Sequence, residues 1–247
     1  MSEPEPRVAL VTGAARRVGA AIVRRLHEHG MNVAVHHRGS HEAASELRDA
    51  LEARRPGSVE LVRADLRDPG APEAVVEAAH RRWRRLDAVV NNASVFVPTP
   101  VHATTREQWH EVLGANLEAP FFLSQAAAPY LSEYGGVIVN LTDIHAERPL
   151  KGYSVYCIAK AGLVMLTRSL ARELAPAVRV NAVAPGVVLW PELGPDEPAR
   201  RAIAARVAIG REGDPDDVAR AVLFLVADAS YVTGQVLTVD GGRSLMP

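Results

Sequence analysis

Short apolar runs recur along the chain, and between them lie longer stretches in which apolar residues return at helical spacing. The runs are rich in valine and are not interrupted by polar residues, which is typical of strands buried on both faces of a parallel sheet. The predicted strands are 8–11, 32–36, 59–64, 86–90, 136–141, 178–183 and 235–239. Helices are expected over about 19–29, 42–55, 73–84, 106–132, 156–175 and 215–227. This alternation predicts one α/β domain over 1–247, a doubly wound parallel sheet of about seven strands with helices on both faces.

Composition narrows the class of protein. The chain has 247 residues, 48% of them hydrophobic, and a formal net charge of −1, so nucleic acid and anionic membrane are not expected partners. The basic run Arg81–Arg85 is interpreted as a solvated helix end. The single cysteine, Cys157, excludes an internal disulfide, and no metal site is expected. Residues 1–7 carry no leader pattern and no apolar run is long enough for a membrane span, so a soluble cytoplasmic protein is expected.

The first strand ends in a turn that contains Gly13 and Gly19 and opens a helix. Free backbone amides and the positive end of the helix dipole suit a phosphate at such a turn. Arg17 stands where a dinucleotide-binding pattern would have its middle glycine. We expect this substitution to place a cation near the phosphates of a cofactor.

The end of the second strand indicates which nucleotide binds. It reads His37-Arg38-Gly39-Ser40, without the acidic residue that usually accepts from the ribose of NAD. Arg38, Ser40 and Arg17 suit a 2′-phosphate, so NADPH is predicted, and the alternative is a solvated basic turn. Asp65, at the end of the third strand, could accept from an adenine amino group or cap the next segment.

Tyr156 and Lys160 are the central candidates for chemistry. Four residues apart, they share one face of a helix, and a neighbouring ammonium lowers the pKa of a phenol. Lys151 and Lys160 are the only lysines in the chain, so few pairs with this spacing are expected by chance. The alternative interpretation is a tyrosine and a lysine on the surface of a helix. Asp143 follows a buried strand and reaches the same sheet edge, where it could join the site or merely accept from loop amides.

Further candidates lie in the loop after the fourth strand and in the helix that follows. Phe96 could offer a flat face to a planar substrate, whereas Phe121 and Phe122 are assigned to the core. Asn116, within an apolar stretch, could hold a water that leads to Lys160. Residues 189–195 are too rich in proline for a helix and are interpreted as a mobile lid.

The chain resembles the short-chain dehydrogenase/reductase family. The motifs that carry the resemblance span nearly the whole chain, and they are Thr12-Gly13, Asn91-Asn92-Ala93, Asn116, Tyr156 with Lys160, Asn181 and Pro185-Gly186. The resemblance implies a Rossmann fold, a nicotinamide cofactor and, often, a homotetramer. Within the family the details are similar to pteridine reductases, in Arg17, in 36–40, in 92–100 and in Asp143, which stands where most members have serine.

The resemblance also implies roles for individual residues. Asp143, Tyr156, Lys160 and Asn116 would be catalytic. The cofactor would be held by Gly13, Arg17, Val18, His37, Arg38, Ser40, Asp65, Leu66, Asn92, Ala93, Ser94, Thr142, Tyr156, Lys160, Pro185, Gly186 and Val188. A pterin would stack between the nicotinamide and Phe96, and the substrate residues would be Arg17, Ser94, Phe96, Asp143 and Tyr156.

The chemistry of Asp143 favours the same subgroup. An ionised carboxylate only accepts hydrogen bonds, so it would repel a ketone oxygen that turns into an alkoxide, whereas a C=N bond takes up a proton at nitrogen. The predicted function is NADPH-dependent reduction of a pterin such as dihydrobiopterin, dihydrofolate or dihydromonapterin. Because Asp143 opposes Lys160, the net pKa of Tyr156 stays open. The alternatives are a carbonyl reductase, for example of 3-oxoacyl carrier-protein thioesters, and a cofactor-binding regulator without turnover.

Overall fold

A seven-stranded parallel sheet runs through the middle of the protein, in the order β3-β2-β1-β4-β5-β6-β7. The computed structural model describes residues 5–188 and 196–246. The strands are β1 (Val8–Val11), β2 (Asn32–His37), β3 (Val59–Arg63), β4 (Ala88–Asn91), β5 (Val137–Leu141), β6 (Arg179–Pro185) and β7 (Val236–Val239). All the predicted strands are confirmed, and so is the doubly wound α/β fold.

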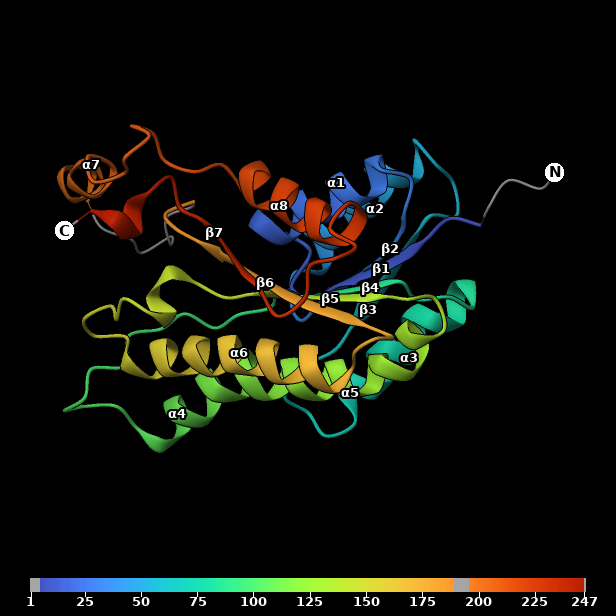
Figure 1. The fold of residues 1–247 in the computed structure, drawn as a ribbon, viewed down its shortest axis with the longest axis horizontal. Coiled ribbons are helices and arrows are strands. Elements are labelled where there is room, and N and C mark those ends of the chain that lie inside the picture. The colour runs from blue at the N-terminus through green and yellow to red at the C-terminus, as the bar shows by residue number, and fades with distance from the viewer. Residues whose placement is uncertain (1–4, 189–195, 247) are drawn as a thin grey trace.

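Helices cover both faces of this sheet (Figure 1). One layer holds α1 (Arg17–Glu28), α2 (His41–Glu52) and α8 (Pro215–Ala227), and the other holds α3 (Ala71–Trp83), α4 (Arg106–Leu113), α5 (Ala119–Ser132) and α6 (Ser154–Glu173). Successive strand residues face opposite layers, so Val11 packs under α1 while Leu10 packs over α5. Burial on both faces explains why the strands are uninterrupted apolar runs.

The helix predicted over 106–132 is divided by a π-helical turn, Gly114–Glu118. Thr105 and Gln108 form a capping box that starts α4. Pro120 has no N–H to donate to the carbonyl of Asn116, and the Ala119 N–H reaches back five residues to the carbonyl of Gly114. The turn places Asn116 where its side chain faces the loop after β4.

Some short elements were not predicted. They are α7 (Glu197–Ala204) and the two 3-10 turns η2 (Ile144–Ala146) and η3 (Arg243–Leu245). Each has too few apolar residues to show a helical repeat. The lid predicted over residues 189–195 lies outside the described residues.

The helix α6 is long and apolar enough to cross a membrane by length and composition alone, which the sequence analysis did not anticipate. Within its apolar 18-residue window, 56% is buried inside the protein. Leu163 and Leu170 are among its buried side chains. Such burial is typical of a helix that packs in a protein core, and no other described helix passes the same test.

Candidate active site

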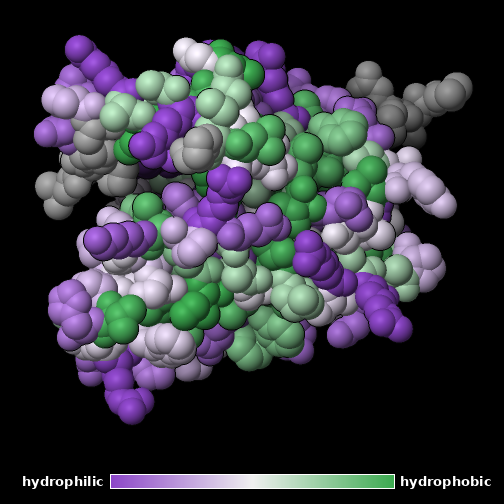
Figure 2. Space-filling model, turned by 60° about the vertical axis from the view of Figure 1, so that its left-hand side comes forward, coloured by the Kyte–Doolittle hydropathy of each residue, from purple (hydrophilic) through white to green (hydrophobic). Residues whose placement is uncertain are grey.

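The predicted site residues come together at the carboxyl edge of the sheet. Gly13 follows β1, Asn92 follows β4, Asp143 follows β5 and Gly186 follows β6. The strand order reverses direction between β1 and β4, the switch point at which open α/β sheets bind ligands. Figure 2 brings this side of the molecule forward, and its outline is indented between the two helical layers.

The turn after β1 is fixed from the β4 side. Gly13 has a φ of 59°, and a Cβ on it would lie 2.8 Å from the Ala93 Cα, so only glycine fits. The Thr12 hydroxyl oxygen accepts from the backbone N–H groups of Asn92 and Ala93, each at 2.9 Å. The Asn92 side-chain amide donates to the carbonyls of Thr12 at 2.8 Å and Gly13 at 3.0 Å. The two motifs named in the sequence are therefore in direct contact.

The same turn is held from β2 by His36, which sequence reasoning missed. The Gly13 N–H donates to His36 Nδ1 at 3.2 Å, and the Ala14 N–H donates to the His36 carbonyl at 2.8 Å. The sequence gives no sign of this contact. His36 was predicted to be the last residue of the second strand, and the cofactor contacts predicted at the end of that strand all came after it.

The beginning of α1 fits a phosphate group. Arg16 is the N-cap residue of this helix, and its side chain makes no capping hydrogen bond. Arg17 adopts a left-handed conformation, with a φ of 56°. The N–H groups at the start of a helix, together with adjacent arginines, suit an anion at this position.

The predicted adenosine side contains a cluster of charges. One Arg38 guanidinium nitrogen lies 3.7 Å from the Asp65 carboxylate, and the Arg38 side chain is 56% exposed. Arg67 donates two hydrogen bonds to Asp65, at 2.9 and 2.6 Å, and these hold the pKa of Asp65 down at about 2. The carboxylate predicted to accept from adenine is thus already engaged by Arg67, which the sequence analysis did not single out.

Next to that cluster, polar groups remain without protein partners. Ser40 is the N-cap residue of α2, yet its side chain makes no capping hydrogen bond. The side chain of His37 is 2% exposed, and its Nδ1 is the one buried side-chain nitrogen or oxygen without a hydrogen-bond partner among the described residues. Such orphaned groups beside Arg38 fit the phosphate and base of a nucleotide.

Tyr156 and Asp143 are in direct contact. The Tyr156 hydroxyl donates to Asp143 Oδ2 at 2.8 Å, while Asp143 Oδ1 accepts from the His145 backbone N–H at 2.8 Å. Asp143 therefore makes both of the contacts considered for it, since one oxygen caps the η2 turn and the other accepts from the phenol.

The pKa of Tyr156 is raised well above 10, chiefly because burial disfavours the phenolate. The charge of Asp143 and the hydrogen bond to it add to the rise, and the neighbouring Ser94 hydroxyl opposes it. The net pKa of Tyr156, which the sequence left open, is therefore raised. Tyr156 holds its proton across the physiological range.

Lys160 lies over the ring of Tyr156. Its ammonium nitrogen is 5.6 Å from the ring centroid and donates to the Leu141 carbonyl at 2.8 Å. Burial lowers the pKa of Lys160 to about 8, partly offset by Asp143. A buried ammonium with donors to spare suits a polar ligand such as a ribose.

Asn116 positions the loop after β4. Its amide nitrogen donates to the carbonyls of Val95 and Val112, each at 2.9 Å, and its oxygen accepts from the Ser94 hydroxyl at 2.6 Å. The amide hydrogens hold Val95 and Val112, and the amide oxygen holds Ser94 in the loop beside Tyr156. The predicted water path to Lys160 stays a prediction.

Phe96 lies at the rim of the site and is 38% exposed. One of its faces stacks on Tyr153, with centroids 4.3 Å apart and planes 12° apart, and its ring meets Tyr156 edge-on at 4.8 Å. A planar ligand could therefore use only the other face. Sequence reasoning missed Tyr153, although its place three residues before Tyr156 is a signal that could have found it.

The remaining predicted cofactor residues line the same edge. The Thr142 hydroxyl donates to the Val183 carbonyl at 3.0 Å. Gly186 lies so close to Asp240 that a Cβ would come within 2.6 Å of the Asp240 Cβ. The other predicted residues in these turns are the buried Val188 and the half-buried Val18, Leu66 and Pro185.

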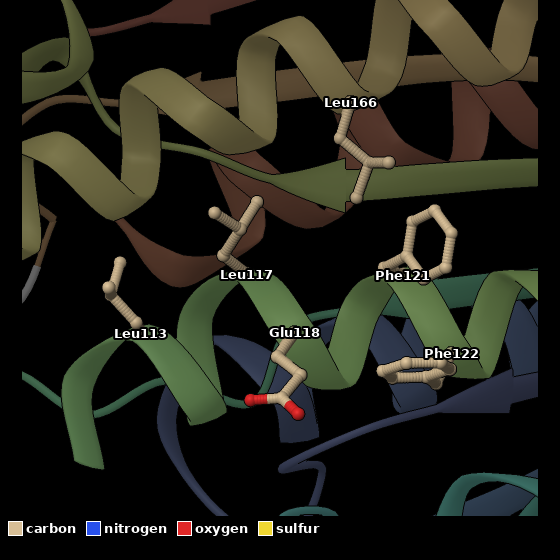
Figure 3. Close-up of a pocket in the computed structure, with 6 residues that line it drawn as sticks. All are labelled: Leu113, Leu117, Glu118, Phe121, Phe122 and Leu166. Carbon is tan, nitrogen blue, oxygen red and sulfur yellow. The ribbon is translucent and has the colours of Figure 1, made fainter. Parts of the chain in front are cut away.

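Phe121 and Phe122 are not in the core, which corrects the prediction. Each is 39% exposed, and their rings meet edge to face at 5.2 Å. Both line an apolar hollow of about 300 Å³ between the π turn, α5 and α6, away from the sheet edge (Figure 3). Its other lining residues are Leu113, Leu117, Glu118 and Leu166.

Comparison with known proteins places the site in context. Residues 13–244 match the family model described as enoyl-(acyl carrier protein) reductase. The chain is 37% identical to 3beta-hydroxysteroid dehydrogenase 1 of Eggerthella lenta, covering 98% of this chain and 95% of the relative. It is also 37% identical to pteridine reductase 1 of Leishmania tarentolae, covering 99% and 98%. Identity to a 3-oxoacyl acyl-carrier-protein reductase of Staphylococcus aureus is 34%, covering 95% and 96%.

Proposed function

This chain belongs to the short-chain dehydrogenase/reductase family of oxidoreductases, and from that premise we propose that it is an NADPH-dependent pteridine reductase. Its substrate would be a dihydropterin or pterin, such as dihydrobiopterin, dihydrofolate or dihydromonapterin.

One observation carries the proposal, the hydrogen bond from the Tyr156 hydroxyl to Asp143 at 2.8 Å. A carbonyl reductase must stabilise an oxygen that becomes an alkoxide, and hydrogen-bond donors do this best. An ionised carboxylate next to the proton donor does the opposite, since it only accepts. The ring NH and amino groups of a pterin are donors and match it.

The cofactor assignment rests on the donor set. The turn at Gly13 and the first turn of α1 would hold the pyrophosphate, Lys160 would hold the nicotinamide ribose, and Arg38 with Ser40 would hold the 2′-phosphate. Bound NADPH would supply hydride to a ring carbon of the substrate.

The chain's own residues would handle the proton and the substrate ring. Tyr156 would supply or relay the proton to the ring nitrogen, which its raised pKa supports, because the hydroxyl stays protonated. Asp143 would orient that hydroxyl. The free face of Phe96 would stack on the pterin, held in place by Tyr153 on its other side.

A carbonyl reductase acting on 3-oxoacyl thioesters is the second candidate. It is favoured by the similar identity to the Staphylococcus aureus reductase, 34% against 37% for the pteridine reductase. These comparisons support both candidates equally, so Asp143 is what separates them.

The experiment is NADPH consumption by the purified protein with dihydrobiopterin, dihydrofolate and an acetoacetyl thioester in parallel. Turnover of a pterin without turnover of the thioester is the expected result. Turnover of the thioester alone would replace the proposal with the second candidate, and NADPH binding without any turnover would favour the regulator.

The proposal includes a cytoplasmic homotetramer, as the family resemblance implies. The exposed apolar hollow at Phe121 and Phe122 supports assembly through α5 and α6 (Figure 3), since exposed apolar patches mark contact surfaces. Light scattering should give the mass of four chains, and a monomer would contradict this part of the proposal.

A further inference from the structure

His36 connects the carboxyl ends of three neighbouring strands. Its Nδ1 accepts from the Gly13 N–H after β1 at 3.2 Å, and its Nε2 donates to the Ala64 carbonyl after β3 at 3.2 Å. The side chain is 3% exposed. The imidazole thus lies across the sheet edge directly beside the turn that would meet the phosphates.

Only one protonation state of His36 satisfies both contacts. Nδ1 must be bare to accept, and Nε2 must carry the hydrogen to donate. Burial lowers the pKa of His36 to about 4; the nearby His37 lowers it further, while Asp65 and the bond to Ala64 oppose the change. The ring therefore stays neutral, and able to accept from Gly13, throughout the physiological range.

The Gly13 amide has little freedom to find another partner. Gly13 has a left-handed φ of 59° and touches Ala93 on its other side. Without an acceptor at Nδ1, the peptide between Thr12 and Gly13 would have to rotate to find one. That rotation would move the Thr12 carbonyl, which belongs to the same peptide and accepts from the Asn92 side chain.

We propose that His36 is a positioning residue for the nucleotide, because its Nδ1 holds the Gly13 amide and keeps the turn in the conformation that receives the phosphates. The inference rests on the proposed nicotinamide cofactor but not on the identity of the substrate.

Two substitutions at His36 test its two hydrogen bonds separately. In asparagine the side-chain oxygen is attached to Cγ, as Nδ1 is in histidine, so His36→Asn keeps an acceptor for the Gly13 N–H. Glutamine reaches farther, so His36→Gln keeps a donor for Ala64 and loses the contact with Gly13. His27→Gln is the matched control, because His27 is also a buried histidine, 4% exposed, whose Nε2 contacts Ser58 at 2.8 Å at the other end of α1.

The readout is the dissociation constant for NADPH, measured by fluorescence without substrate and alongside the thermal midpoint of each variant. We expect His36→Gln to weaken binding about tenfold, as the loss of one partly buried hydrogen bond implies. His36→Asn should stay within about threefold of the wild type, and His27→Gln should bind NADPH normally even if its midpoint falls.

Equal binding by the two His36 variants, whether both normal or both weakened, would overturn the proposal. A loss of binding in His27→Gln as large as in His36→Gln would do so too, because it would reflect general destabilisation. Failure of the wild type to reduce pterins would contradict the proposed substrate and leave this comparison of binding intact.

Discussion

The turn at Gly13 and the pair Asp143–Tyr156 lie on the same sheet edge, but they are held in different ways. At the turn, each hydrogen bond joins a backbone amide or carbonyl to a side chain, and the partners are His36 in β2 and Asn92 and Ala93 just after β4. The pair depends on one hydrogen bond between two side chains, in surroundings that raise the pKa of the phenol. Contacts between side chains and the backbone fix the shape of the turn, whereas burial and a contact between two side chains fix the protonation state of Tyr156.

Removing the phenol hydroxyl should give the largest effect and would break the pair while leaving the turn intact. Tyr156→Phe should lower kcat by about 10³-fold, as expected for loss of a general acid. The dissociation constant for NADPH should hardly change. Stopped-flow turnover measures the loss, with Tyr153→Phe as a control that keeps the stacking on Phe96; a kcat within tenfold of the wild type would remove Tyr156 from proton transfer.

The pH dependence of the free energy of unfolding tests the burial of Lys160, whose ammonium lies over the Tyr156 ring. The pKa of Lys160 in the folded protein is about 8, below the ordinary 10.5, so the unfolded chain binds the proton more tightly between these values. Burying the ammonium therefore costs stability below pH 8, and this cost is relieved as the pH rises. The free energy of unfolding should rise by about 3 kcal/mol over that range.

Urea unfolding of the wild type and of Lys160→Met at several pH values measures this slope. The rise should be missing in Lys160→Met, which has no charge to bury. The same slope in both proteins would mean that another group titrates.

Asp143→Asn keeps the shape of the pair and removes its charge. We expect kcat with a pterin to fall by about 10²-fold, the lower end for groups that assist proton transfer. Without the charge, the pKa of Tyr156 falls, so the phenolate forms at lower pH and the alkaline loss of rate should move to lower pH. The pH profile of kcat measures this shift, and an unchanged profile would show that Asp143 does not act on the phenol.

Thr12→Val tests the turn and should have the smallest effect. It leaves the backbone N–H groups of Asn92 and Ala93 without their acceptor. We expect the free energy of unfolding to fall by about 2 kcal/mol. Thr12→Ser keeps the oxygen and is the control. Chemical denaturation compares the two, and equal stability would show that the hydroxyl is dispensable.

The sheet and the positions of the motifs around it could be predicted from the sequence, because they depend on the order of strands and turns along the chain. Apolar runs mark strands buried on both faces, and Gly13 and Asn92 follow strands that the fold makes neighbours. Asp143, Tyr156 and Phe96 were also brought together as predicted.

What the sequence could not supply is the balance of contacts at each side chain. The pKa of Tyr156 depends on burial, Asp143 and Ser94 together, and burial is the largest of these influences. His36 was missed because its contact joins residues 23 positions apart through a ring nitrogen. Phe121 and Phe122 look like core residues in an apolar segment, yet the π turn and α5 leave them partly exposed.

The most direct test of the central claim is the ratio of kcat/KM for dihydrobiopterin to that for an acetoacetyl thioester, compared between the wild type and Asp143→Ser. A serine can donate a hydrogen bond to a developing alkoxide, whereas the carboxylate cannot. The account predicts that the wild type favours the pterin and that Asp143→Ser shifts the ratio toward the thioester by about 10²-fold or more, with NADPH binding unchanged. An unchanged ratio would contradict the claim that the Asp143–Tyr156 pair selects the substrate.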